Sequence, residues 1–122
     1  MPKKILVVED YADSRSMLAY LLQSLGYETT EAASGTQALE RAVSDKPHLI
    51  LMDVALPGMT GIDAAKALKQ NSTTAHIPII AYSALGSRQW REKALDAGMV
   101  EYLAKPVSVD LIKQTIEKHI LP

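Results

Sequence analysis

The sequence predicts an α/β fold in which short apolar strands alternate with helices. Apolar runs at residues 5–8, 49–52 and 77–82 predict buried strands, and weaker runs at 27–31 and 100–103 bring the total to five. Each run is followed by a segment in which apolar residues recur with helical spacing. Strands that are apolar throughout and alternate with helices favour a parallel sheet covered on both faces. Five units are too few for a closed eight-stranded barrel, so we expect an open, doubly wound sheet.

The first two helices carry clear end signals. Gly26 follows the first helical segment at the position of a C-terminal cap. Ser34, with Gln37 three residues later, forms a capping-box pattern that opens the second helix, and Pro47 ends it.

The other three helices are placed by similar signals. The third is expected around residues 62–68, the fourth ends near Gly98, and Ser108 opens the fifth. The basic residues of the third and fourth helices, Lys66 and Lys69 among them, are interpreted as solvated faces.

Length and composition restrict the classes of function. A chain of 122 residues suits one domain, here residues 1–122. The net charge of −1 provides no basic field for nucleic acid, and the absence of cysteine excludes disulfides and thiol chemistry. No apolar run approaches the ~20 residues of a membrane span, and the N-terminus lacks a signal peptide's apolar region. We expect a cytoplasmic protein with no direct contact to nucleic acid or membrane.

Polar residues stand where the predicted strands end. Glu9 and Asp10 follow the first strand, Asp53 the third, Ser83 the fourth and Lys105 the fifth. In a parallel sheet these positions meet at one edge, where ligands of doubly wound folds bind. Two like charges ~4 Å apart repel by about 4 kcal/mol at an effective dielectric of 20. A hard divalent cation with oxygen ligands would offset that repulsion, so the cluster predicts a Mg²⁺ site.

Each of these residues also has a purely structural interpretation. Asp10 could cap the following helix, and Asp53 could begin a turn. Ser83 alone would more often be a turn or cap residue, and Lys105 alone a solvated one. Only the combination favours chemistry. Asp53 would then attack phosphorus to give an aspartyl phosphate, Glu9 and Asp10 would organise Mg²⁺, and the other two would bind phosphoryl oxygens.

These residues resemble the response-regulator receiver domains of two-component phosphorelay signalling, along essentially the whole chain. Residues 5–10 resemble the family's first strand and acidic pair, and residues 51–61 resemble its phosphoacceptor loop. Ser83-Ala84 resembles its Thr/Ser-Ala switch. Gly98, Tyr102 and Lys105-Pro106 resemble its fifth-strand signature. The resemblance implies a flavodoxin-like (βα)5 fold with strand order 2-1-3-4-5, the order found in chemotaxis-type receivers.

The resemblance also implies roles for individual residues. The backbone carbonyl of Ala55 should be a Mg²⁺ ligand beside Asp10 and Asp53, with Glu9 acting through water. Ser83 and Tyr102 should form the coupled switch, in which the hydroxyl moves toward the phosphoryl group and the ring turns inward. The Lys105–Pro106 peptide bond should be cis, which an X–Pro bond allows at small cost.

Partners follow from the same resemblance. A histidine kinase or phosphotransfer protein should meet the first helix near residues 12–17. A downstream protein target should meet the face of the fourth helix, fifth strand and fifth helix, which carries Tyr102 and where a partly exposed Trp90 is expected. The chain would be a monomer or a weak, phosphorylation-linked dimer. It would be no enzyme beyond catalysing its own phosphorylation and dephosphorylation.

Two apolar positions flank the expected phosphorylation site. Ala55, and Leu85 two residues after Ser83, cannot orient an attacking water. We therefore hypothesise slow self-dephosphorylation.

Three rival classes are weighed against this interpretation. A flavodoxin-like FMN carrier would need a hydroxyl-rich phosphate loop where Glu9-Asp10 stand. A phosphatase with an aspartate nucleophile would need a second aspartate where Ala55 stands. A receiver-like scaffold that acts only by binding would have no use for the full acidic set and Lys105.

The three histidines are scattered without ligand spacing and are interpreted as structural or surface residues. They are His48, His76 and His119.

Overall fold

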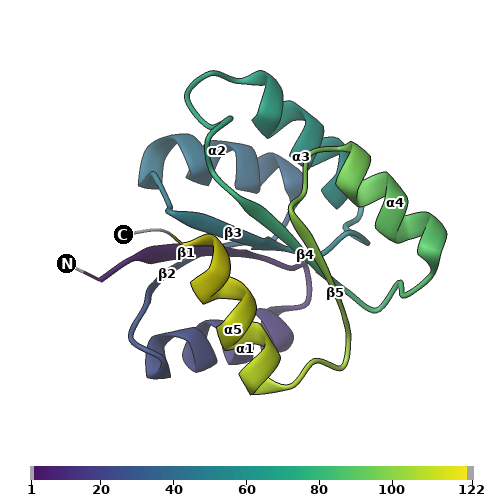
Figure 1. The fold of residues 1–122 in the computed structure, drawn as a ribbon. Helices are drawn as coiled ribbons and strands as arrows, with labels where there is room; N and C mark the ends of the chain where they lie inside the picture. The colour runs from purple at the N-terminus through teal and green to yellow at the C-terminus, as the bar shows by residue number, and fades with distance from the viewer. Residues whose placement is uncertain (1, 121–122) are drawn as a thin grey trace.

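Five parallel strands form the centre of the molecule, as the computed structural model shows for residues 2–120 (Figure 1). Met1, Leu121 and Pro122, which the predicted domain range includes, lie outside the described residues. Strands and helices alternate along the chain as predicted. The elements are β1 (Lys4–Val8), α1 (Ala12–Ser24), β2 (Glu28–Ala32), α2 (Gly35–Asp45), β3 (Leu49–Met52), α3 (Gly61–Gln70), β4 (Ile79–Ser83), α4 (Arg88–Asp96), β5 (Glu101–Ala104) and α5 (Val109–His119).

The strand order is β2-β1-β3-β4-β5, as the resemblance implied. Helices α1 and α5 cover one face of the sheet, and α2, α3 and α4 cover the other (Figure 1). Strand β3 shows why the strands are apolar throughout. Leu49 and Leu51 point into the core under α1 and α5, whereas Ile50 and Met52 point into the core under the other three helices. Both faces of the strand are therefore buried.

The caps predicted from the sequence for the ends of α1, α2 and α5 are present in the structure. Gly26 adopts a φ of +97°, which favours glycine, and its N–H and that of Tyr27 bond back to the last turn of α1. The Ser34 hydroxyl accepts the Gln37 N–H at 3.1 Å, and Ser108 caps α5 in the same way.

Strand β4 begins two residues later than predicted, at Ile79 rather than residue 77. Pro78 has no N–H to donate to a strand ladder, and the Ile77 N–H bonds to the Thr74 carbonyl in the preceding turn. The apolar run therefore covers the end of a connection as well as the strand.

The interpretation of Lys69 as a solvated residue is wrong. Its ammonium donates to the backbone carbonyls of Ala75 at 3.1 Å and Ile77 at 2.7 Å. Burial lowers the pKa of this amine. Lys69 thus closes the connection between α3 and β4.

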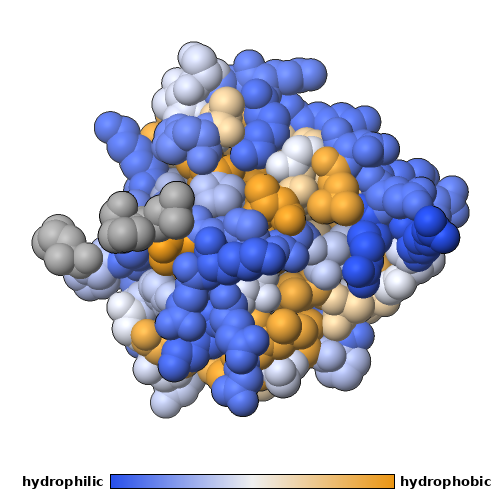
Figure 2. All heavy atoms as spheres, in the orientation of Figure 1, coloured by the Kyte–Doolittle hydropathy of each residue, from blue (hydrophilic) through white to orange (hydrophobic). Residues whose placement is uncertain are grey.

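The face shown in Figure 2 is mainly hydrophilic over α4 and α5, with smaller hydrophobic patches between the elements. Among residues 2–120, no helix is both long enough and apolar enough to cross a membrane.

Candidate functional site

The site lies at the edge where the strands end at their carboxyl termini. The register pairs Val8 with Met52 across β1 and β3, and Ser83 with Ala104 across β4 and β5. The backbone continues this alignment, because the Asp53 N–H bonds to the Val8 carbonyl at 2.9 Å and the Lys105 N–H to the Ser83 carbonyl at 2.8 Å. The residues that follow the strands are thereby brought together.

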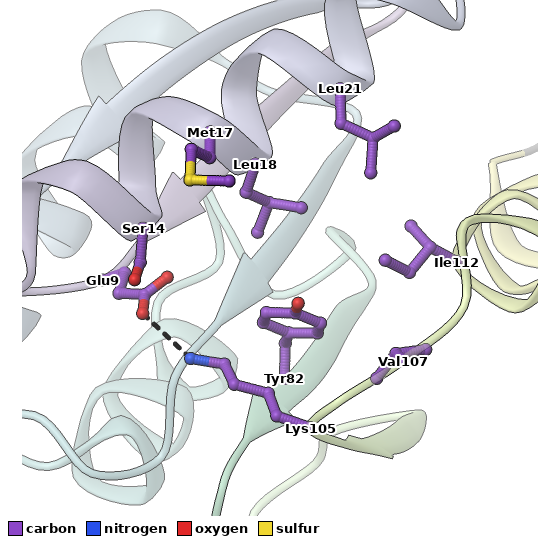
Figure 3. Close-up of a pocket in the computed structure, with 9 residues that line it drawn as sticks. All are labelled: Glu9, Ser14, Met17, Leu18, Leu21, Tyr82, Lys105, Val107 and Ile112. Carbon is purple, nitrogen blue, oxygen red and sulfur yellow. Dashed lines mark hydrogen bonds and ion pairs between the residues drawn. The ribbon is translucent and has the colours of Figure 1, made fainter.

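Lys105 connects two buried carboxylates at this edge. Its Nζ lies 2.9 Å from Oε1 of Glu9 and 3.6 Å from Oδ2 of Asp53 (Figure 3 shows the first pair). The Glu9 side chain is only 6% exposed and that of Asp53 12%. Burial disfavours the charge of Lys105, but the hydrogen bond to Glu9 and the charge of Asp53 outweigh it and raise the pKa of the ammonium. Lys105 is therefore held in its charged form.

Asp53 combines the structural and the chemical interpretations. Its Oδ1 accepts the Ala55 N–H at 3.0 Å, as in an Asx turn. Its Oδ2 faces the ammonium of Lys105. One carboxylate oxygen thus orders the loop and the other remains available at the sheet edge.

The capping interpretation of Asp10 is wrong. The N-cap of α1 is Tyr11, and no side chain caps this helix. Asp10 is exposed beside the buried Glu9. It is therefore an accessible carboxylate next to the Glu9–Lys105–Asp53 group.

Oxygen donors at this edge suit Mg²⁺. Within residues 2–120, no three His, Cys, Asp or Glu side chains converge closely enough to enclose a metal by themselves. Mg²⁺ does not need such an enclosure, because it keeps several waters and is usually bound through one or two carboxylates. Two buried carboxylates face one ammonium here, and Asp10 adds a third negative charge nearby. The donor set and the excess of negative charge fit a hard cation.

The two predicted switch residues meet at Leu85 rather than at Asp53. The hydroxyl of the fully buried Ser83 accepts the Leu85 N–H at 3.2 Å, and the Tyr102 hydroxyl donates to the Leu85 carbonyl. Tyr102 is only 8% exposed, so its ring already points inward, and the Arg91 guanidinium lies 5.8 Å from the ring centroid. Burial raises the pKa of this phenol, so it keeps its donor proton at neutral pH. The Lys105–Pro106 peptide bond is cis, as expected.

Trp90 is partly buried against the core under α2, α3 and α4. It lines a hollow between α3 and α4, next to Ile62 and Lys66, and the ammonium of Lys93 lies 4.9 Å from its ring. Partial exposure agrees with the sequence interpretation, and the output role stays a prediction.

The histidines are less scattered than their sequence positions indicated. His48, His76 and His119 line one hollow at the opposite end of the sheet from Asp53. His48 accepts the Lys4 N–H at 3.0 Å, and His119 pairs with Glu101 at 2.8 Å. Two of the three therefore have the structural roles expected of them.

Sequence reasoning missed two contacts of the site. The Arg15 guanidinium donates to the Glu9 carbonyl at 2.8 Å, which fixes the start of the loop after β1. The ring of Tyr82 lies beside Lys105, with 4.8 Å between Nζ and the ring centroid. A signal existed for Tyr82, because strand alternation places it on the opposite face of β4 from Ser83, under α1 and α5.

Comparison with known proteins agrees with this geometry. Residues 5–117 match the family described as the response regulator receiver domain. The chain belongs to this family. It is thus a receiver of two-component signalling rather than a classical enzyme.

Several receivers are similar to this one along nearly the whole chain. The polar-differentiation response regulator DivK of Brucella anthropi is 35% identical over 120 residues, which is 98% of each chain. The receiver domain of the sensor histidine kinase PA1611 from Pseudomonas aeruginosa PAO1 is 34% identical with a TM-score of 0.91, and 98% of each chain is covered. That structure has a magnesium ion coordinated in its active site cleft. The chemotaxis protein CheY4 of Vibrio cholerae is 30% identical with a TM-score of 0.91, covering 99% of this chain and 100% of that one.

Proposed function

We propose that this receiver is a phosphorylation-dependent switch that accepts a phosphoryl group on Asp53, with Mg²⁺, from a histidine kinase or phosphotransfer protein. One observation carries the proposal: the buried Asp53 and Glu9 carboxylates share the ammonium of Lys105 at the sheet edge. A buried nucleophile beside a fixed cation suits phosphoryl transfer, which depends on positioning and charge neutralisation.

The transfer is assigned to Oδ2 of Asp53, because Oδ1 is occupied by the Ala55 N–H. Oδ2 forms a bond to phosphorus as the bond from phosphorus to the donor's histidine nitrogen breaks. The electron pair of that bond stays on the imidazole, which takes up a proton from water. Lys105 then binds a phosphoryl oxygen with the charge that it already holds close to Asp53.

Magnesium would be held by Asp10, Asp53 and the backbone carbonyl of Ala55, with Glu9 acting through water. When bound, the ion would supply charge neutralisation for the phosphoryl oxygens. The similarity to the PA1611 receiver, which holds magnesium in its cleft, supports this assignment.

The switch would pass through Leu85. Once a phosphoryl group attracts the Ser83 hydroxyl, the Leu85 N–H loses its acceptor and the loop after β4 has to rearrange. Tyr102 would be affected as well, because its hydroxyl donates to the Leu85 carbonyl in this loop. The affected surface would be the face of α4, β5 and α5, where a downstream protein target would bind.

The phosphodonor would dock on α1. On this helix Met17 is 73% exposed and Tyr20 69%. A largely apolar pocket lies between α1 and α5 beside Lys105 (Figure 3). An apolar surface beside Lys105, which contacts Asp53, is what a partner that delivers a phosphoryl group would need. The cytoplasmic location, and the choice between a monomer and a weak, phosphorylation-linked dimer, stay predictions.

Intact mass spectrometry after treatment with acetyl phosphate and Mg²⁺ tests the proposal. One phosphate adduct is expected on the wild type and on Asp63→Asn, whose exposed aspartate lies on α3. None is expected on Asp53→Asn or after removal of Mg²⁺ by EDTA. An adduct that survives Asp53→Asn overturns the site, and a wild type without any adduct favours the scaffold that acts only by binding.

A further inference from the structure

Two carboxylates and one aromatic ring surround the ammonium of Lys105. Glu9 and Asp53 attract its ammonium from the side of the site, and the ring of Tyr82 lies on the other side, 4.8 Å from Nζ. Figure 3 shows the Tyr82 ring lying alongside the aliphatic stem of Lys105. A cation at this distance from an aromatic face is within the range of a cation–π contact.

Tyr82 is itself held firmly. It belongs to β4, where it pairs with Leu103, and its ring packs against the core under α1 and α5. Leu18 and Ile112 lie on the far side of the ring from Lys105 (Figure 3). Burial raises the pKa of the Tyr82 phenol, so at neutral pH the ring is an uncharged partner for the ammonium.

A rigid neighbour such as the Tyr82 ring would restrict the position of the Lys105 ammonium. A lysine side chain carries a flexible four-carbon stem and a point charge, so two carboxylates alone leave several positions open to the ammonium. It also follows β5 in a loop, outside the regular strand. A ring fixed in the sheet reduces those positions to the ones that face Asp53.

We propose that Tyr82 is a positioning residue that holds the Lys105 ammonium at the phosphoryl site by a cation–π contact. The ring acts through Lys105 and touches no reacting atom. The inference rests on the proposed function for its effect on phosphoryl transfer, whereas the placement of Lys105 can be tested without any phosphodonor.

Two substitutions separate positioning from space filling. Tyr82→Phe keeps the ring and removes only the hydroxyl. Tyr82→Leu fills much of the same apolar space without a π face, and Tyr82→Met serves instead if the leucine variant does not fold. Circular dichroism and the urea midpoint establish which variants are folded.

The first readout is the reactivity of the Lys105 amine. Trace acetylation at pH 8, read by peptide mass spectrometry, compares Lys105 with the exposed Lys66 of the same molecule. A cation–π contact stabilises the charged, unreactive form, so Tyr82→Leu should raise relative labelling of Lys105 about two- to fivefold. Tyr82→Phe should match the wild type.

The second readout is the rate of adduct formation with acetyl phosphate and Mg²⁺. Tyr82→Leu should slow it about two- to fivefold, and Tyr82→Phe should leave it unchanged. Labelling in Tyr82→Leu equal to the wild type overturns the inference, and so does a phenylalanine variant that behaves like the leucine variant. If no protein forms an adduct, the proposed function fails, while the labelling result still decides the role of Tyr82.

Discussion

Gly61 lies directly against the backbone of Asp53, the proposed phosphoacceptor. A Cβ at this position would be 2.2 Å from the Asp53 carbonyl oxygen and 2.8 Å from the Val54 Cα. Backbone atoms cannot yield as the end of a flexible side chain can. The start of α3 therefore reaches the loop after β3 only because this residue has no side chain.

Gly61→Ala is expected to lower the free energy of unfolding by about 1–3 kcal/mol, because the loop has to shift to admit the methyl group. It should also slow adduct formation on Asp53. Gly86→Ala is a matched control in another loop of this edge, since its Cβ would meet only Ala104 at an ordinary 3.8 Å. Urea unfolding of both variants measures the effect. Equal midpoints for the two would show that the loop tolerates the change.

The lifetime of a phosphoryl group on Asp53 would depend on the side chains that flank it. Ala55, two residues after Asp53, is exposed, and Leu85, two residues after Ser83, is partly buried. Neither can hold an attacking water, so we expect an aspartyl phosphate that survives for minutes or longer. Ala55→Glu should accelerate its loss about tenfold, because a carboxylate can orient water.

The decay is followed by intact mass after the donor is removed. Val43→Glu, on the exposed side of α2, adds the same charge far from the site and should leave the decay unchanged. Loss of the group from the wild type within seconds would contradict the slow decay.

The placement of strand-end residues could be predicted from sequence, but their pairing could not. Parallel strands of known order require Glu9, Asp53 and Lys105 to share an edge. Which carboxylate lies nearer to the Lys105 ammonium depends on the lengths and conformations of the side chains. In the structure the shorter contact is to Glu9. The role of Leu85 is invisible in sequence, because it acts through an N–H and a carbonyl that nearly every residue has.

Lys69 of α3 contacts both the connection from α3 to β4 and the turn that follows α4. It bonds to the carbonyls between α3 and β4, and its stem lies where Gly98, with a φ of +100°, leaves space after α4. The sequence contains a signal for this placement. Lys69 stands four residues after the buried Ala65 and seven after Ile62, so helical spacing puts it on the buried face of α3.

Lys69→Met keeps the length of the stem and removes the two hydrogen bonds. The variant should lose about 1–3 kcal/mol of unfolding free energy, because two carbonyls lose a charged donor. Lys66→Met, on the exposed side of the same helix, should lose much less. Urea unfolding compares the two. A Lys66→Met variant as destabilised as Lys69→Met would contradict the stabilising role of the two Lys69 hydrogen bonds.

Each edge strand of the sheet, β2 and β5, is linked to a helix through a carboxylate. Asp45, the last residue of α2, accepts a hydrogen bond from Thr30 of β2. Glu101 of β5 lies 2.8 Å from His119 and 3.1 Å from Lys118 of α5. The sequence could predict the strand order through the family resemblance. These ties could not be predicted, since they join residues far apart in the chain through polar side chains with no pattern.

The two ties predict how stability depends on pH. The Thr30 hydroxyl lowers the pKa of Asp45, although burial opposes it, and the hydrogen bond with His119 lowers that of Glu101 against the same opposition. A carboxyl with a lowered pKa in the folded state stabilises the fold above its ordinary pKa, 3.8 for Asp and 4.5 for Glu. That stabilisation is lost as the pH falls through the lowered folded value.

The free energy of unfolding should therefore decrease as the pH falls below about 4.5. Glu101→Gln should be less stable than the wild type at pH 7, and the difference should shrink on acidification as the wild-type carboxylate becomes protonated. Urea unfolding of both proteins between pH 7 and 3 measures this convergence. Glu117→Gln, an exposed carboxyl on α5, controls for the loss of one charge, and a constant gap between Glu101→Gln and the wild type would show that the tie does not titrate as proposed.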